Sequence, residues 1–288
     1  MPLDQVDVDK LAEQEAEMSF LEHLEALRWH LVRSGAAILI ISLVVFAAKS
    51  FVFGTVVLGP TQGDFTTYRV FCSLGQSLGL SETLCMEVPQ FDWVTPVFGE
   101  KFIIHIRVSI IIGFILSFPY VFWEIWRFVK PGLYAAEQKA ARGIVLICSG
   151  LFATGVLFGY YVIAPFAVTF LMNYELEGVR SAPALSSYVS YLSLFTVPAG
   201  VIFQLPVFVY FLARVGLITA EFMKSYRKHA VVVLLALSAM ITPPDVVTQI
   251  LLGLPLYGLY EVSIVIAARV ERQRARDEAA AQTAARLN

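Results

Sequence analysis

The residue types that carry out catalysis occur in this chain without the spacing that catalysis requires. His23 and His30 are seven residues apart and do not form the H-E-x-x-H pattern of a zinc-binding helix. The sequence also lacks a G-x-S-x-G nucleophile turn and a glycine-rich phosphate loop. It therefore predicts a protein that is not an enzyme and has no metal site or cofactor.

Two polar side chains lie inside long apolar runs, where an unpaired polar group is costly. Gln204 either bonds to a neighbouring helix or faces a partner or a water-filled cavity. Glu261 is ionisable and is for that reason a functional candidate, although Tyr257 and Tyr260 are close enough in sequence to satisfy it structurally. Both residues are candidates for an intramembrane polar site.

Glu137 is a candidate anion for binding a cationic partner. Pro131 and Gly132 end one element, so Glu137 falls in the first turns of the next helix, where the helix dipole favours an ionised carboxylate. A carboxylate at such a place can pair with a guanidinium group in a bidentate geometry. It can equally serve only to stabilise its own helix, and the residue type alone leaves both roles open.

The elements that position these residues are predicted to lie in a membrane. Of the 288 residues, 58% are apolar and 15% are charged, against roughly 45–50% and about 25% in a soluble domain. Helices that face acyl chains can carry this much apolar surface, whereas a soluble protein of this size cannot. The net charge of −2 gives no electrostatic basis for binding nucleic acid.

We expect an all-α integral membrane protein with six transmembrane helices, because about 20 helical residues cross a hydrocarbon core. The predicted spans are 31–48, 102–123, 143–166, 188–213, 230–241 and 246–268. The last two are expected to be short, and residues 230–241 reach only about 18 Å as a helix. They are joined at Pro243, Pro244 and Asp245, which form an extracytoplasmic turn because adjacent prolines cannot continue a helix.

Prolines recur in or beside the spans, and such prolines bend membrane helices. They are Pro119, Pro165, Pro198, Pro206 and Pro255. The sequence therefore predicts a bent, cupped bundle.

The positions of Lys and Arg predict the orientation. With the N-terminus inside, sixteen of the 21 basic residues fall on cytoplasmic segments, so the positive-inside rule places both termini of this multi-pass protein in the cytoplasm. Residues 51–101 then form a folded outer loop, a cap. Cys72 and Cys85 lie in this loop, where a disulfide can persist.

We divide the chain into three regions on composition. Residues 1–17 are predicted to be a disordered acidic tail, residues 18–268 the transmembrane domain, and residues 269–288 a cytoplasmic C-terminal tail, either a frayed helix or disordered.

Four short motifs follow one another along the chain: FLEHLEALR at residues 20–28, WRFVKPGLYAAE at 126–137, FQLP at 203–206 and TPPD at 242–245. In this order they resemble the TatC family, the signal-peptide receptor subunit of the twin-arginine protein translocase. Residues 20–28, FLEHLEALR, resemble the family's H-L-x-E-L-R opening, and residues 126–137 resemble W-x-F-x-x-P-G-L-Y-x-x-E. Residues 203–206, FQLP, and residues 242–245, TPPD, match the family's mid-span and turn motifs. Each motif alone is weak, whereas four motifs placed correctly against the spans are specific.

The resemblance implies a function and its residues. Cytoplasmic carboxylates capture the two arginines of a signal peptide, and the bent spans cradle the apolar segment of that peptide. The implied signal-peptide site consists of Glu137, Phe128, Glu22, Glu25, Arg28, Leu24, Leu27 and Lys130. The implied partners are the lipid bilayer, other copies of the chain and the single-span proteins TatA and TatB, with energy from the proton gradient of the cell (inner) membrane.

This chain departs from the family at one of these positions. Ala26 stands where H-L-x-E-L-R has its Glu, and Glu25 is one residue earlier. Neighbouring helix positions point about 100° apart, so Glu25 is not an automatic substitute, whereas Glu22 lies one turn before Ala26 on the same face.

Two rival hypotheses belong to other classes. In a small-solute secondary transporter, Gln204, Glu261 and the broken helices would bind the solute, but no inverted repeat supports this alternative. A purely structural membrane scaffold would not depend on Glu137.

Overall fold

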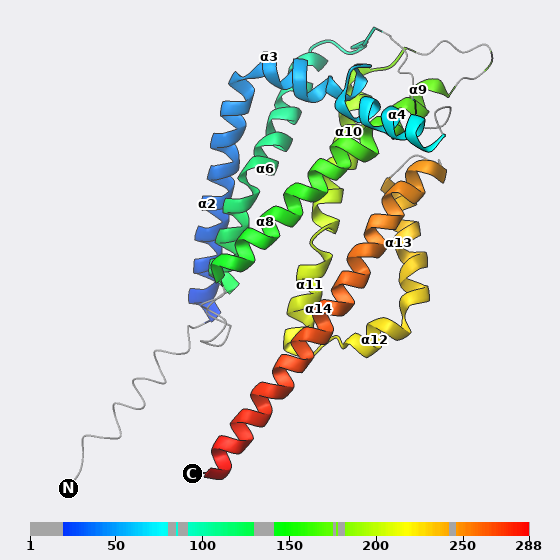
Figure 1. Ribbon diagram of the computed structural model, residues 1–288. Coiled ribbons are helices and arrows are strands. Elements are labelled where there is room, and N and C mark those ends of the chain that lie inside the picture. Colours follow the sequence, from blue (N-terminus) through cyan, green and yellow to red (C-terminus); the bar gives the residue numbers. More distant parts are fainter. Residues whose placement is uncertain are drawn as a thin grey trace.

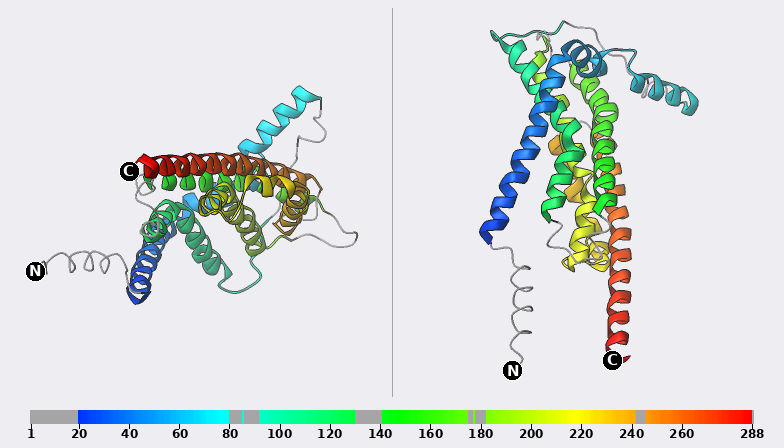
Figure 2. Two further views of the ribbon diagram at one scale, coloured as in Figure 1. Left: turned by 90° about the horizontal axis from the view of Figure 1, so that it is seen from below. Right: turned by 90° about the vertical axis from the view of Figure 1, so that its left-hand side faces the viewer.

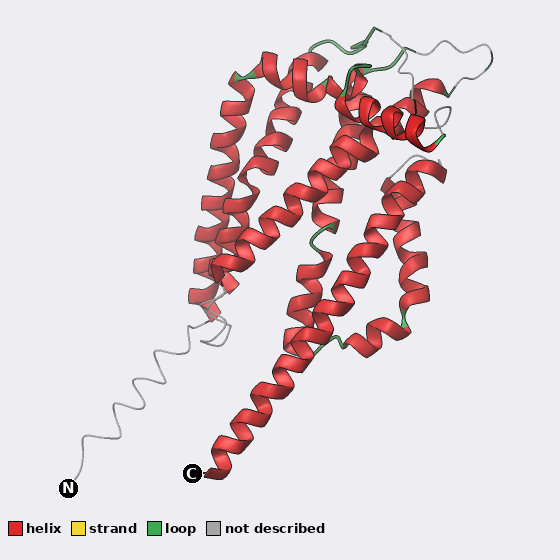
Figure 3. Ribbon diagram, viewed as in Figure 1, coloured by secondary structure: helices red, strands yellow, loops and turns green. Residues whose placement is uncertain are grey.

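The structure is a computed structural model that describes residues 20–79, 85, 92–129, 141–174, 177, 182–241 and 246–287. Within these ranges the regular elements are helical, as Figure 3 shows by colour. The longer α-helices are α2 (Phe20–Ala47), α4 (Thr66–Leu78), α6 (Glu100–Val129), α8 (Ala141–Phe158), α9 (Ala164–Asn173), α10 (Leu185–Ile202), α11 (Leu205–Val215), α13 (Arg227–Ile241) and α14 (Val246–Leu287). The short elements are α3 (Lys49–Phe51), η1 (Val52–Val57), η2 (Gly59–Thr61), η4 (Gly159–Ile163) and α12 (Ala220–Ser225).

Five helical stretches in the described part are long and apolar enough to cross a membrane. They are Leu27–Ala47, Glu100–Phe128, Gly143–Asn173, Leu185–Val215 and Thr248–Arg276. Helix α13 has 15 residues and falls short of this length. It reaches about 22 Å, which agrees with the expectation that this segment is too short to cross the hydrocarbon core alone.

Two predicted boundaries differ from the structure. Helix α2 runs unbroken from Phe20, so the N-terminal motif and the first span form one helix. Helix α14 has 42 residues, and the prediction that the last two spans are both short is therefore wrong for the last one. The tail after residue 268 continues the helix because it is rich in Ala, Arg, Gln and Glu, which favour helix.

Some of the prolines lie inside continuous helices, whereas one separates two helices. Pro119, Pro198 and Pro255 lie inside continuous helices. By contrast, α10 ends at Ile202 and α11 begins at Leu205, directly before Pro206. The predicted fourth span is therefore two helices, because a proline cannot donate the hydrogen bond that would continue the first one.

Pro165 removes a second backbone hydrogen bond, and a side chain from a neighbouring helix takes its place. It follows the π-helical turn η4, and it has no N–H to donate to the carbonyl of Tyr161 four residues earlier. Thr67 Oγ1 of α4 donates to that carbonyl instead, at 2.6 Å. The outer loop is thus joined to the bundle at the point where the proline interrupts the helix.

The described part of the predicted cap includes α3, η1, η2 and α4, and Val94 further along it pairs with Ala184 before α10. Two carbonyls of the π-helical turn η1 receive hydrogen bonds from tyrosines of the bundle. Tyr160 donates to Val56 O at 2.7 Å, and Tyr188 donates to Val57 O at 2.5 Å. These bonds satisfy polar backbone groups that would be costly to leave unpaired next to lipid.

The helices lie at different inclinations and pack around three core clusters, of which one joins α11, α12 and α14. Figures 1 and 2 show α2 beside α6, and α14 beside α11 and α13. Helices α8 and α10 approach closely through glycine, since a Cβ on Gly155 would lie 2.8 Å from Gly200 Cα. A second core cluster joins η4, α9, α10, α13 and α14, and a third joins α2, η1, α6, α9 and α10.

Candidate functional site

The beginning of α2 and the end of α6 lie together at the lower end of the bundle in Figure 1. Glu124 of α6 is 1% exposed, and its Oε2 lies 2.5 Å from Nδ1 of His30 in α2. Tyr120 donates to Glu124 Oε1 at 2.9 Å, and Arg127 Nη1 is 3.8 Å from the same oxygen. A buried carboxylate is therefore held by a group from each helix.

Phe128 belongs to the same cluster. Its ring contacts His30 edge-on, with the ring centroids 6.2 Å apart. Glu25, Leu27 and Arg28 are exposed on the nearby start of α2. The structure thus brings part of the predicted signal-peptide site to one place on the surface.

The rest of that predicted site is not described in full. Lys130 and Glu137 lie outside the described residues, as do Pro243, Pro244 and Asp245 of the predicted turn. Glu22 and Leu24 lie within α2, and for them the structure describes the backbone only.

Gln204 lies in the break between α10 and α11 and is 6% exposed. Its Nε2 donates to Cys148 O of α8 at 3.2 Å and is 3.5 Å from Gly200 O. Its Oε1 is buried and has no partner within the part of the chain that the structure describes. Of the two roles expected for Gln204, the structure shows the bond between helices.

Glu261 is held by two side chains. Arg227 Nη2 of α13 lies 2.8 Å from its Oε2, and Tyr257 donates to its Oε1 at 2.8 Å. Tyr260, the other expected partner, donates to Met223 O instead. With Gln204 bonded to a carbonyl and Glu261 paired, these residues do not favour the solute transporter.

Cys72 and Cys85 are joined by a disulfide, which agrees with the predicted pairing. The bond links α4 to the segment that follows it. Cys148 is a free thiol and is completely buried.

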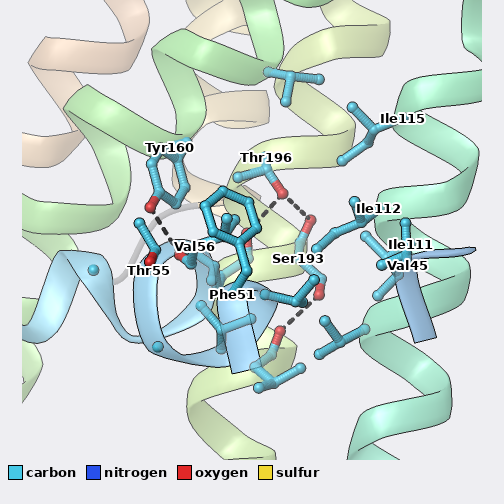
Figure 4. A pocket seen from close by; sticks show the side chains of 18 of the residues that line it. Val45, Phe51, Thr55, Val56, Ile111, Ile112, Ile115, Tyr160, Ser193 and Thr196 are labelled. Carbon is cyan, nitrogen blue, oxygen red and sulfur yellow. Dashed lines mark hydrogen bonds between the residues drawn. The ribbon is translucent and has the colours of Figure 1, made fainter. Parts of the chain in front are cut away.

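A cavity of about 810 Å³ opens at the upper end of the bundle. Figure 4 shows apolar side chains of α2, η1 and α6 around it, with Tyr160 beside Val56 of η1, and Ser193 and Thr196 of α10 between η1 and α6. Ser193 and Thr196 both donate to carbonyls of their own helix, so the wall that they form is effectively apolar. The composition of this cavity suits an apolar occupant.

Sequence reasoning missed the cavity and the pair His30–Glu124. The two members of that pair are 94 residues apart. The available signal was Glu124 itself, an acid one residue beyond the predicted end of an apolar span.

Comparison with known proteins identifies the architecture. The family model for Sec-independent protein translocase protein (TatC) matches residues 22–255. The chain belongs to the TatC family. It is 38% identical over 265 residues to the TatC protein of Blattabacterium sp. subsp. Periplaneta americana, covering 90% of this chain and 98% of that one.

Other relatives agree with this assignment. The TatC protein of Carboxydothermus hydrogenoformans is 34% identical, covering 87% of this chain and 93% of that protein. A crystal structure of a twin-arginine translocase receptor, TatC, in DDM superposes with a TM-score of 0.65 at 31% identity, covering 85% of this chain and 99% of that one. A second crystal structure of such a receptor gives a TM-score of 0.62 at 29% identity, covering 87% and 100%.

Family membership confirms the resemblance drawn from the four motifs. It makes the chain a component of a protein translocase, a multi-pass membrane protein with five candidate spans, rather than an enzyme.

Proposed function

We propose that this chain is the core receptor and scaffold of a twin-arginine translocase. Its cytoplasmic face binds twin-arginine signal peptides, and it assembles with TatA and TatB to export folded proteins. The observation that carries the proposal is the junction of α2 and α6, where His30 contacts Phe128, and Glu25 and Arg28 are exposed on the same helix as His30.

Carboxylates are the natural partners for two adjacent arginines, because a guanidinium group forms bidentate hydrogen bonds that a lysine cannot copy. In our proposal Glu137 supplies one carboxylate, and Glu22 or Glu25 of α2 supplies the other. Phe128, Leu24, Leu27, Arg28 and Lys130 complete the signal-peptide site. Surface ion pairs contribute at most about 1 kcal/mol each, so the arginines alone would bind weakly.

The apolar cavity supplies the second point of attachment. Phe128 and Ile112, which lines the cavity, are sixteen residues apart on α6, which corresponds to about 24 Å along the helix. A helical apolar segment of about sixteen residues spans that distance. Engaging the arginines and the apolar segment together raises the affinity far above that of either contact.

The topology of the proposal follows the distribution of charge. The lower end of the bundle, with Arg127, Arg214 and Lys224, faces the cytoplasm, and the cap faces outward. Helix α13 is the short fifth span in chain order, α14 contains the sixth, and the turn at residues 242–245 lies outside. Residues 18–268 form the bent, cupped transmembrane domain in the cell membrane, flanked by an acidic N-terminal tail and a cytoplasmic C-terminal tail.

The partners are those that the family implies. TatA and TatB are single-span proteins, other copies of the chain join the complex, and the proton gradient supplies the energy. The cytoplasmic face of the chain brings the signal peptide to this assembly.

The test compares the affinity of a twin-arginine peptide for four proteins: the native chain, Ala26→Glu, Glu137→Ala and the double variant. Ala26→Glu should strengthen binding by roughly 1–3 kcal/mol, the range for hydrogen bonds to charged groups. A twin-lysine peptide should gain less, because lysine cannot form the bidentate contact. Glu137→Ala should remove most of the native affinity.

Each outcome has a distinct meaning. If Ala26→Glu leaves the affinity unchanged while Glu137→Ala destroys it, Glu22 or Glu25 already fills the second place. If Glu137→Ala binds like the native chain, the proposed site is wrong.

A further inference from the structure

We propose that Glu124 and His30 are positioning residues that fix the start of α2 against the end of α6. They thereby fix where the carboxylates of α2 lie relative to Phe128 and to the segment that leads to Glu137. The effect on peptide binding rests on the proposed function, whereas the contact that holds α2 against α6 rests on the structure alone.

Apolar packing does little to hold the start of α2. Among residues 25–39 whose exposure the structure describes, Ser34 is the one that is buried. Leu27, Trp29, Leu31 and Val32 are between 42% and 71% exposed. Contacts between apolar side chains are also non-directional, so they would allow this part of α2 to rotate or slide along α6.

The hydrogen bond between His30 and Glu124 is directional and partly buried, with Glu124 fully buried and His30 17% exposed. A charge in this position is costly unless it is paired, and Glu124 is 1% exposed within the candidate span Glu100–Phe128. Separating the helices here would leave the carboxylate with Tyr120 and with Arg127, which is 45% exposed and 3.8 Å away. The cost of losing His30 therefore holds α2 in one register.

The position of the pair connects it to binding. His30 also contacts Phe128, and it lies five residues after Glu25 on the same helix. Residue 26, at which the family has its Glu, is one helical turn before His30. A shift of His30 would thus move the carboxylates of α2 relative to Phe128 and to the segment that leads to Glu137.

The same two helices provide a matched control at their upper end. His105 Nε2 of α6 lies 3.1 Å from Phe46 O of α2, and the two rings stack with centroids 3.9 Å apart. This histidine also joins α2 to α6, but at the opposite end of the two helices from Glu25 and Phe128, and neither His105 nor Phe46 lines the cavity.

The test uses the double variant His30→Leu/Glu124→Leu, because replacing both members of a buried pair by apolar residues usually preserves folding. Spin labels are placed on cysteines at Leu31 and Ile125, which are 71% and 51% exposed. The native cysteines do not interfere, since Cys72 and Cys85 are disulfide-bonded and Cys148 is buried. The full chain is studied in lipid nanodiscs.

We expect a narrow distance distribution between the labels in the native chain and a broad one in the double variant. The affinity for a twin-arginine peptide should fall on the order of tenfold, because contacts that must be engaged together lose their shared geometry. Glu124→Gln keeps a hydrogen-bonding group at this position and should retain both the narrow distribution and the affinity. His105→Leu should change neither.

An unchanged distance distribution in the double variant, or an unchanged affinity despite a broadened one, would overturn the proposal. So would an equal loss of affinity in His105→Leu, because that result would indicate a general loss of stability. If the native chain does not prefer the twin-arginine peptide over a twin-lysine peptide, the proposed function fails, whereas the distances still show whether the pair fixes α2 against α6.

Discussion

At the scale of single residues, three polar side chains within the apolar helices have partners from other elements. Glu124 is held by His30, Glu261 by Arg227, and Gln204 bonds to a carbonyl of α8. The contacts of Glu124 and Gln204 are partly or fully buried, where leaving a partner unpaired costs more than the net value of the bond, whereas the pair Arg227–Glu261 is exposed. Their arrangement makes helix contacts specific in a bundle whose surface is mostly apolar.

Glycines also make helix contacts specific, at positions where two helix backbones lie very close together. At Gly113 a Cβ would lie 2.9 Å from both Ser42 Cα and Ser42 N, which are backbone atoms of α2 that cannot turn aside. Gly113→Ala should therefore lower the free energy of unfolding by about 1–3 kcal/mol, the usual cost of overpacking. Thermal unfolding in detergent measures the effect.

Gly150→Ala is the matched control. Gly150 also lies inside a long helix, but a Cβ there meets no atom within 4 Å. This variant should be neutral or more stable by about 0.5–1 kcal/mol, because alanine favours helix over glycine. Equal destabilisation by both changes would contradict the assignment of Gly113 to a close helix contact.

At the scale of elements, the prolines divide the long apolar runs and leave backbone carbonyls that other elements must satisfy. Pro206 separates α10 from α11, and Pro165 follows the π-helical turn η4. Thr67 of α4 provides the missing donor at Tyr161 O. An outer-loop helix is thereby part of the hydrogen bonding of a predicted span.

We expect Thr67→Val to destabilise the protein. The change keeps the shape of the side chain but removes the hydroxyl that donates to Tyr161 O, and Thr67 is only 4% exposed. An unsatisfied buried acceptor costs about 1–3 kcal/mol. Thermal unfolding should reveal the loss.

Thr154→Val makes the same chemical change on α8, where Thr154 Oγ1 donates to Gly150 O of its own helix and is exposed. Its effect should stay within about 0.5 kcal/mol. If both valine variants behave alike, the bond from α4 does not contribute specifically.

At the scale of the whole molecule, the proposed orientation places the cap outside the cell and α12 inside. Single cysteines at Phe98 and Phe222 test this, since their side chains are fully exposed and about half exposed, respectively. A membrane-impermeant maleimide should label Phe98→Cys in intact cells and Phe222→Cys only after lysis. The reverse pattern, or labelling of both in intact cells, would reject the topology.

The sequence by itself determined the class of protein, most of its spans and its family. A helical span satisfies its backbone hydrogen bonds within itself and faces lipid, so it appears in the sequence as a long apolar run. The pairing of Cys72 with Cys85 was also accessible, because two cysteines in one predicted outer loop have few alternatives. Motif order supplied the rest of the identification.

Only the tertiary structure decided which polar groups meet. His30 and Glu124 are 94 residues apart, and Arg227 and Glu261 are 34 apart. The local pattern around each residue does not specify how far one helix is rotated and shifted against another. The cavity beneath the cap depends on the same relative placement, because residues of several elements line it.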